Sequence, residues 1–139
     1  MLLTKKVKHR KWQKTRMGEK KMNRPETRGI TISFGSFGLK ADGQSRVESK
    51  QLESARKVLS RTLGKTGKLW IRVFPDRPIT AKPPEVGMGK GKGDPKGYCF
   101  EVRPGRVIFE VDGVVEAVAR EALRKAGTKL PMKTRIVAR

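Results

Sequence analysis

The chain has 139 residues, and its 34 Lys and Arg against 13 Asp and Glu give a formal net charge of +21 at pH 7. That length is enough for one domain with a modest core, but self-repulsion makes so large an excess costly for an isolated compact protein. One cysteine, Cys99, excludes an internal disulfide and a multi-cysteine zinc site. The single histidine, His9, lies in the basic N-terminal stretch, so we expect no Ser-His-Asp set.

A polyanionic partner removes the cost of this charge, and the phosphate backbone of a nucleic acid is the densest such partner. A membrane surface would favour Trp or Phe beneath Lys and Arg on one apolar face, and no segment combines the two. No run of about eighteen apolar residues occurs, so we expect no transmembrane helix. We therefore expect a cytoplasmic nucleic-acid-binding protein that is not an enzyme and uses no metal or cofactor.

Residues 1–28 carry eleven basic side chains against two acidic ones, Glu19 and Glu26. Their few apolar residues show no lasting period, so the segment cannot bury enough surface to fold alone. We expect a basic N-terminal extension that becomes ordered on RNA, with a solvated tail as the alternative. Residues 29–139 are then predicted to form a single α+β domain.

The first elements of that domain are a strand and a helix. Residues 30–34 look like a short strand, which residues 35–38 then break. From Val47 the apolar period becomes helical, with Ser45 and Glu48 as a candidate capping box and Gly64 as the stop. The predicted buried face carries Leu52, Ala55, Leu59 and Leu63, and the opposite face carries Lys50, Lys57 and Arg61. Those three charges face either solvent or phosphate.

The second half alternates strands and turns. Residues 68–74 have large apolar groups on both faces, which predicts a strand covered on two sides and ended by residues 75–78. Its Trp70 and Phe74 are better explained by core packing than by base stacking. A long loop is predicted over residues 82–97, followed by a tight hairpin of residues 98–103 and 106–111. The inward-facing sets of that hairpin are predicted to be Tyr98, Phe100, Val102 and Val107, Phe109, Val111.

A second helix is predicted over residues 114–126, and a last strand over 132–137. Gly127 is the expected helix stop, and Asp112 with Gly113 the expected turn and cap before it. The apolar stripe would be Val118, Ala119, Ala122, Leu123 and Ala126, and the spacing favours ion pairs of Glu116 with Arg120 and Glu121 with Lys125. The predicted architecture is α+β, a small mixed sheet with two helices, one long loop and the basic arm.

The loop contains the most informative pattern, a glycine-lysine run of seven residues. These are Gly87, Met88, Gly89, Lys90, Gly91, Lys92 and Gly93. Alternate glycines let backbone N–H groups approach a ligand, and the lysines add charge at the same place. The spacing matches neither the G-x-x-x-x-G-K-[ST] nucleotide loop nor the G-x-G-x-x-G dinucleotide loop. We interpret the run as a loop that contacts nucleic-acid phosphates, with a flexible solvent loop as the alternative.

Several segments together resemble the bacterial-type ribosomal large-subunit protein sixteen family, which also includes the archaeal and eukaryotic ten-e protein. They are residues 33–41 (SFGSFGLKA), 67–80 (GKLWIRVFPDRPIT), 88–93 (MGKGKG), 104–106 (PGR), 112–113 (DG) and 129–134 (KLPMKT). They occur in unbroken order over nearly the whole chain. A free nucleic-acid chaperone and a phosphoryl-transfer enzyme are the other classes considered, and the second lacks any acidic metal-ligand pattern beside the loop.

The resemblance implies an α/β-hammerhead type of fold and a structural role in the large ribosomal subunit, in cytoplasmic or organellar ribosomes. It also implies binding to large-subunit rRNA, proximity of residues 87–93 to A-site and P-site tRNA near the peptidyl transferase centre, and a part in late assembly. The residues expected to contact rRNA are Lys5, Lys6, Lys8, Arg10, Lys11, Lys14 and Arg16 in the arm and Lys50, Lys57 and Arg61 on the helix.

Two positions depart from the family pattern. Gly87 stands where the family usually has Arg, a residue that some bacteria hydroxylate, so we expect this chain to lack that modification. Lys65 stands where Arg is common, and residues 17–28 are longer than the usual arm.

Overall fold

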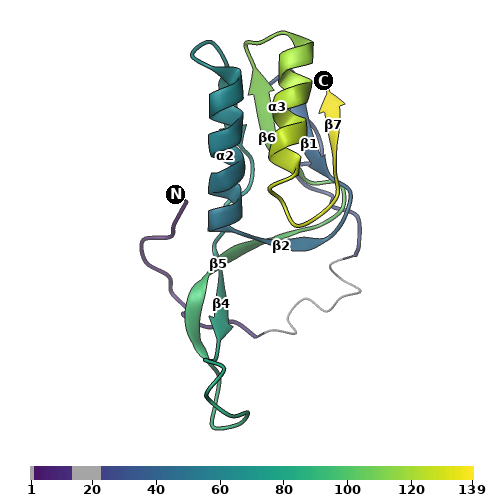
Figure 1. Cartoon of the computed structure of the whole chain (residues 1–139). Helices are drawn as coiled ribbons and strands as arrows, with labels where there is room; N and C mark the ends of the chain where they lie inside the picture. Colours follow the sequence, from purple (N-terminus) through teal and green to yellow (C-terminus); the bar gives the residue numbers. More distant parts are fainter. Residues whose placement is uncertain (1, 14–22) are drawn as a thin grey trace.

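The computed structural model describes residues 2–13 and 23–139. Within them the chain forms two helices and two antiparallel sheets (Figure 1). The first sheet, in the order β3-β6-β1-β7, consists of Lys68–Ile71, Val107–Asp112, Phe37–Ala41 and Thr134–Ala138. The second, in the order β2-β5-β4, consists of Ser45–Glu48, Asp94–Val102 and Arg77–Ala81. The predicted α+β class is confirmed, with two antiparallel sheets in place of one mixed sheet.

The core lies between the helices and the four-stranded sheet. Helix α2 (Ser49–Leu63) packs against α3 (Glu116–Gly127), and α3 also contacts β1 and β7. In β6, Phe109 and Val111 pair with Leu39 and Phe37 of β1. The predicted apolar stripes of both helices are buried except at Val118, which is 37% exposed. Burying these side chains away from water is the main force that holds this part of the molecule together.

Helix α2 begins two residues later than the sequence predicts. Residues 45–48 pair with β5, with Val47 opposite Phe100, so strand pairing holds them in extended conformation up to the cap. The capping box is therefore formed by Glu48 and Gln51 instead of Ser45 and Glu48. Gly64 ends the helix at φ 67°, where glycine avoids the steric cost of a Cβ, as predicted.

Residues 30–34 form no strand, and residues 35–38 do not break one, because β1 starts at Phe37. The reason is the side chain of Glu110, whose carboxylate accepts the backbone N–H groups of Ser33, Phe34 and Gly35. These three N–H groups are therefore not available for hydrogen bonds to a neighbouring strand. A Cβ on Gly35 would lie 2.6 Å from the carbonyl oxygen of Val111, so the close approach requires glycine.

The predicted hairpin of residues 98–103 and 106–111 is wrong. Strands β5 and β6 belong to different sheets, and the turn at Pro104 and Gly105 carries the chain from one to the other. Of the predicted inward-facing sets, Tyr98 and Phe100 are half-buried, and the members from Val102 onward are fully buried. Strand β6 is buried on both faces, from Val107 to Val111.

The region around residues 68–97 also differs from the prediction. Strand β3 is short and lies at the edge of its sheet, and a further strand, β4, follows where only a turn was expected. Pro78 fits in β4 because that strand is an edge strand, where a missing N–H is tolerated. The loop is shortened to residues 82–93, since Asp94 already begins β5.

The end of the chain follows the prediction closely. Helix α3 and β7 are displaced from it by one or two residues, and both predicted ion pairs of α3 form. Asp112 makes the predicted turn by accepting the Gly113 N–H at 2.8 Å, but it does not cap α3, which has Val115 at that position. Gly127 is the last helical residue. The three-stranded sheet extends away from the helices, so that the loop forms the far tip of the molecule (Figure 1).

Candidate nucleic-acid interface

The tip of the molecule is the predicted glycine-lysine loop, which connects β4 to β5. Gly89, Lys90 and Gly91 adopt consecutive positive φ values of 97°, 53° and 94°, which turn the chain sharply. A Cβ on Gly87, Gly89 or Gly91 would meet nothing within 4 Å, so glycine is required at 89 and 91 by conformation. Met88 is fully exposed. The loop therefore presents backbone and the Lys90 side chain to the surroundings, while the Lys82 ammonium donates a hydrogen bond to the Gly89 carbonyl.

The base of the loop is joined to the N-terminal arm. The Lys92 ammonium donates a hydrogen bond to the carbonyl of Trp12. In the other direction, Lys11 donates to the carbonyl of Lys92 at 3.3 Å and lies 3.6 Å from a carboxylate oxygen of Asp94. Two segments about eighty residues apart in sequence are thus brought together, and their basic residues form one continuous surface.

A buried arginine extends this junction into the sheet. Arg77, in β4, places its guanidinium 5.6 Å from the centre of the Trp12 ring and donates to the Gln13 carbonyl at 3.2 Å. It also forms an ion pair of 2.8 Å with Glu101, which Arg46 approaches at 3.2 Å. Arg77 and Glu101 each expose only 8% of their side chains. Through the Gln13 carbonyl and Glu101, Arg77 thus links the arm to β4 and β5.

Beside the junction is an open cavity of about 520 Å³ between the arm and the three-stranded sheet. Four arginines contribute to its lining: Arg28, Arg77, Arg103 and Arg106. Three acidic residues, Glu26, Asp76 and Glu101, and the rings of Trp12 and Phe100 complete it. Cation and aromatic ring together are the combination that binds unpaired nucleotides in many RNA-binding proteins.

The first part of the arm lies against the domain. Leu2 packs on the core, and the Ser49 hydroxyl at the start of α2 donates to the Leu2 carbonyl. Of the basic residues predicted to contact rRNA, Lys5, Lys6, Lys8, Arg10 and Lys11 are exposed. Lys14 and Arg16 lie outside the described residues. The arm thus runs from the start of α2, beside the three-stranded sheet, to the base of the loop (Figure 1).

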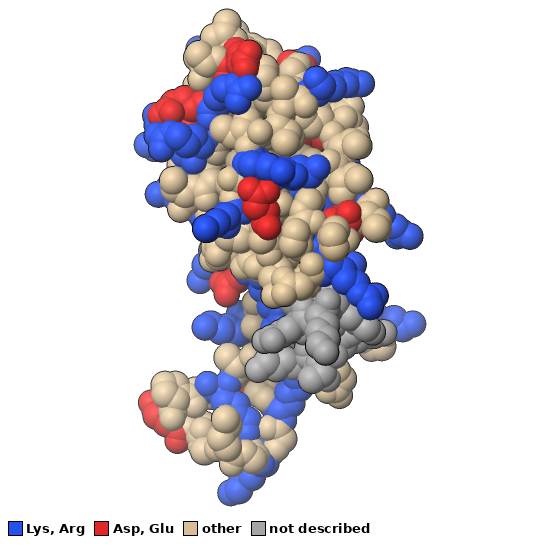
Figure 2. Space-filling model, turned by 90° about the vertical axis from the view of Figure 1, so that its right-hand side faces the viewer, with Lys and Arg blue, Asp and Glu red and all other residues tan. Residues whose placement is uncertain are grey.

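The predicted basic face of α2 is exposed at Lys50, Lys57 and Arg61. Only Lys50 lies near the arm, where it borders a groove with Leu3; Arg61 is about 17 Å farther along the axis at 1.5 Å per residue. A neighbouring arginine, Arg56, is committed to Glu53, and its hydrogen bond lowers the pKa of that carboxyl group to about 2. The structure therefore gathers the arm and the loop at one end and leaves most of the helix face separate. Figure 2 shows that basic side chains occur along the whole length of one face, down to the tip.

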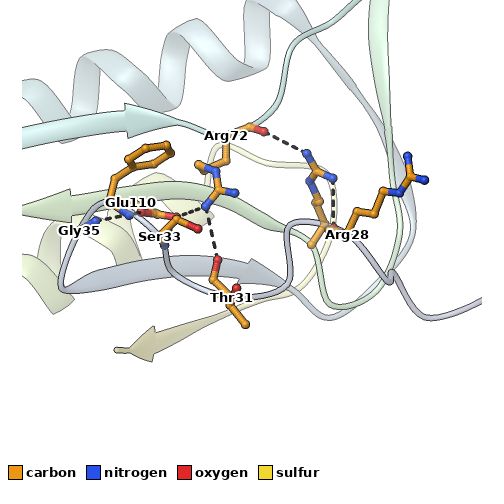
Figure 3. Close-up of polar contacts among 8 residues, drawn as sticks. Arg28, Thr31, Ser33, Gly35, Arg72 and Glu110 are labelled. Carbon is orange, nitrogen blue, oxygen red and sulfur yellow. Dashed lines mark hydrogen bonds and ion pairs between the residues drawn. The ribbon is translucent and has the colours of Figure 1, made fainter.

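A second polar network, on the sheet face opposite the helices, was missed by the sequence analysis (Figure 3). Glu110 is fully buried, and it accepts N–H groups from Ser33 at 3.1 Å, Phe34 at 2.7 Å and Gly35 at 2.9 Å, together with a hydrogen bond from Arg72. Burial alone would raise the pKa of Glu110, but these donors outweigh it and hold the pKa below its ordinary value. A carboxylate in an otherwise apolar strand, VIFEV, was the one available signal.

The single cysteine is not placed as a reactive nucleophile. Cys99 is fully buried, and burial raises the pKa of its thiol to about 11, so it is a protonated core residue. Among residues 2–13 and 23–139, no three His, Cys, Asp or Glu side chains gather in a way that could hold a metal ion. No helix in the same described part is long and apolar enough to cross a membrane.

Comparison with known families agrees with this geometry. The family model described as ribosomal protein L16p/L10e matches residues 4–137, all but the first three and last two residues of the chain. The match includes the arm, both helices and the glycine-lysine loop. The chain therefore belongs to the L16p/L10e family of ribosomal proteins, which are structural proteins of the large subunit.

Proposed function

We propose that this protein binds large-subunit rRNA through its arm and places residues 87–93 beside A-site tRNA, and beside P-site tRNA, near the peptidyl transferase centre of a cytoplasmic ribosome. In that position it supports late assembly of the subunit and translation. The observation that carries the proposal is the junction of Lys11 and Trp12 with Lys92 and Asp94. It makes a cationic arm and a projecting loop into one surface at one end of the molecule.

The residues proposed to contact rRNA come from the arm and from helix α2. The arm supplies Lys5, Lys6, Lys8, Arg10 and Lys11, and helix α2 adds Lys50, Lys57 and Arg61. Lys14 and Arg16 are also proposed and lie outside the described residues. Each neutralised phosphate releases counterions, so several such contacts make binding steeply dependent on salt. Family membership supports rRNA and neighbouring large-subunit proteins as the partners.

Two lysines of the loop take different roles in this proposal. Lys90 lies at the tip and is free to approach tRNA or the rRNA beside it, whereas the ammonium of Lys92 is directed at the Trp12 carbonyl. Gly87 has open space around its Cβ position, so nothing in the fold prevents an arginine there. The absence of that arginine leaves the loop less cationic than the family pattern and without a side chain to hydroxylate.

A photo-crosslinking amino acid at the fully exposed Met88 tests the placement of the loop. The matched control is the same substitution at Val115, which is 69% exposed next to α3. In ribosomes that carry A-site tRNA, position 88 should give a tRNA adduct and position 115 should not. Recovery of the protein only in the free fraction at low salt, or equal tRNA adducts from both positions, would contradict the proposal.

A further inference from the structure

An exposed aromatic ring lies over the outer face of the four-stranded sheet. Phe34 is 57% exposed, its ring centre is 6.2 Å from that of Trp70, and the two planes differ by 18°. The Arg72 guanidinium lies 5.2 Å from the centre of the Phe34 ring. A single exposed apolar side chain needs no explanation, but here an exposed ring is held against a second ring and a guanidinium.

The face on which Phe34 lies belongs to β3 and the residue after it. Side chains alternate along a strand, so Lys68, Trp70 and Arg72 share one face, while Leu69 and Ile71 pack against the core on the other. Trp70 and Arg72 both contact the Phe34 ring, and Phe34 nevertheless remains 57% exposed. The outer face therefore alternates cation, aromatic and cation, with a second aromatic ring on top.

The Phe34 backbone is fixed by the Glu110 network. The N–H groups of residues 33, 34 and 35 all end on one carboxylate, and Arg72 joins that carboxylate to the Thr31 carbonyl at 3.3 Å (Figure 3). Arg106 then holds the Arg72 and Arg28 carbonyls, each at 3.1 Å. Removing a charge from water is costly, and three of the four hydrogen bonds that this buried carboxylate accepts hold one loop, which indicates that the position of the loop matters.

Nearby charge identifies the kind of ligand. Lys68 is exposed, Arg72 is partly exposed, and the surrounding chain has a net charge of +21, which fits a polyanion. The carboxylates at this place are committed: Glu110 to the network, and Asp112 to the Ser36 hydroxyl and the Gly113 N–H, both at 2.8 Å. Bases that are not paired stack on aromatic side chains and on arginine planes, whereas paired bases are not accessible in this way.

We propose that Phe34, supported by Trp70 and Arg72, is a stacking site for an unpaired RNA base, with Lys68 close to the phosphate of the same nucleotide. The site is distinct from the arm and the loop, and it rests on the proposed RNA-binding function. It identifies the ligand class as single-stranded RNA at a bulge, loop or end.

Fluorescence of Trp70 in the full-length protein tests the site, with Trp12→Phe as the background so that Trp70 is the single emitter. A short oligoadenylate should quench Trp70, and a blunt-ended RNA duplex with the same number of phosphates, which has no unpaired base, should bind without quenching. Phe34→Leu should weaken oligoadenylate binding about tenfold without changing the salt slope, because it removes no charge. Phe34→Tyr should restore the affinity.

Phe74→Leu is the matched control, since Phe74 is 43% exposed and its substitution removes a ring elsewhere. Equal losses from the two variants, or RNA binding with no quenching and no effect of Phe34→Leu, would overturn the stacking site while leaving the proposed function intact. Failure to bind either RNA would instead contradict the proposed function.

In assembled large subunits, a photo-crosslinking amino acid at position 34 should give an adduct with rRNA. An adduct with a neighbouring ribosomal protein alone would show that a protein occupies this face and would overturn the proposal.

Discussion

Strands β5 and β6 are adjacent in sequence but lie in different environments. In β6 every residue from Val107 to Val111 is buried, between the helices on one side and residues 28–36 on the other. In β5 only Cys99 and Val102 are fully buried, and exposure increases toward the loop. One end of the molecule is thus stabilised by an apolar core, and the other by charged side chains and the docked arm. The proposed contacts of the arm and the loop therefore lie away from the apolar core, whereas the proposed Phe34 site and the charges of α2 lie on the end that contains it.

The largest expected effect on stability is in the part of the molecule that contains the helices and the four-stranded sheet. Glu110→Gln removes the buried negative charge that pairs with Arg72 and replaces one of the two oxygens that accept the N–H groups of residues 33–35. It should lower the free energy of unfolding by about 3 kcal/mol. Urea unfolding measures this. Glu121→Gln, in an exposed ion pair of α3, is the control and should have a much smaller effect. Similar losses for both would show that the Glu110 network contributes no more than surface charge.

The same network gives the sign of a pH dependence. The pKa of Glu110 is lowered in the folded state. Its contribution to the free energy of unfolding is therefore complete at a pH above the ordinary pKa of 4.5, and it is lost as the pH falls through the lower pKa of the folded state. The difference in stability between the original protein and Glu110→Gln should therefore shrink below that range.

These two regions also differ in how well the sequence predicts them. Helical periodicity identified the buried stripes of α2 and α3, because each buries one face against the core. Strand pairing was not predictable to the same extent: alternation in residues 98–111 is the same whether two strands pair in a hairpin or enter different sheets. Glu110 accepts the N–H groups of residues 33–35 in place of a neighbouring strand, and such a contact between distant residues leaves no pattern in the local sequence.

For the candidate interface, composition identified the arm and the glycine-lysine loop, and residue spacing described the α2 face. It did not identify Trp12, Arg77 or Glu101, because the junction depends on contacts between segments far apart in sequence. Sequence reasoning also favoured a core position for the aromatic residues near β3, whereas Phe74 is 43% exposed and Trp70 is half-buried beneath Phe34.

An intermediate effect is expected at the loop end. Trp12→Ala removes the ring beside the Arg77 guanidinium, a contact that contributes about 0.5–1 kcal/mol at a partly exposed site. Backbone amides of residues 82–93 should then exchange with solvent roughly two- to fivefold faster, while those of β6 stay protected. Hydrogen exchange measured by mass spectrometry reports both. Equal acceleration in β6 would show that the two ends are not independent, and Val115→Ala serves as the unaffected control.

The smallest effect separates the two loop lysines. If Lys90 contacts one phosphate, Lys90→Ala should reduce the salt slope of RNA binding by about 0.7–0.9 without changing hydrogen exchange in the loop. Lys92→Ala should leave the salt slope unchanged and speed up hydrogen exchange in the loop, because the Lys92 ammonium donates to the Trp12 carbonyl. Lys65→Ala, an exposed lysine in the turn after α2, is the control. Identical behaviour of the two loop variants would contradict the division of roles.

The arm and the loop are proposed to face RNA, and the apolar core between the helices and the four-stranded sheet maintains the fold. A map of the large subunit with A-site tRNA bound is the most direct measurement of this arrangement. Density is expected for residues 5–11 along rRNA, for residues 87–93 next to tRNA or the rRNA beside it, and for an unpaired base on Phe34. A map in which residues 5–11 and 87–93 face solvent, with the helical body turned toward tRNA, would contradict it.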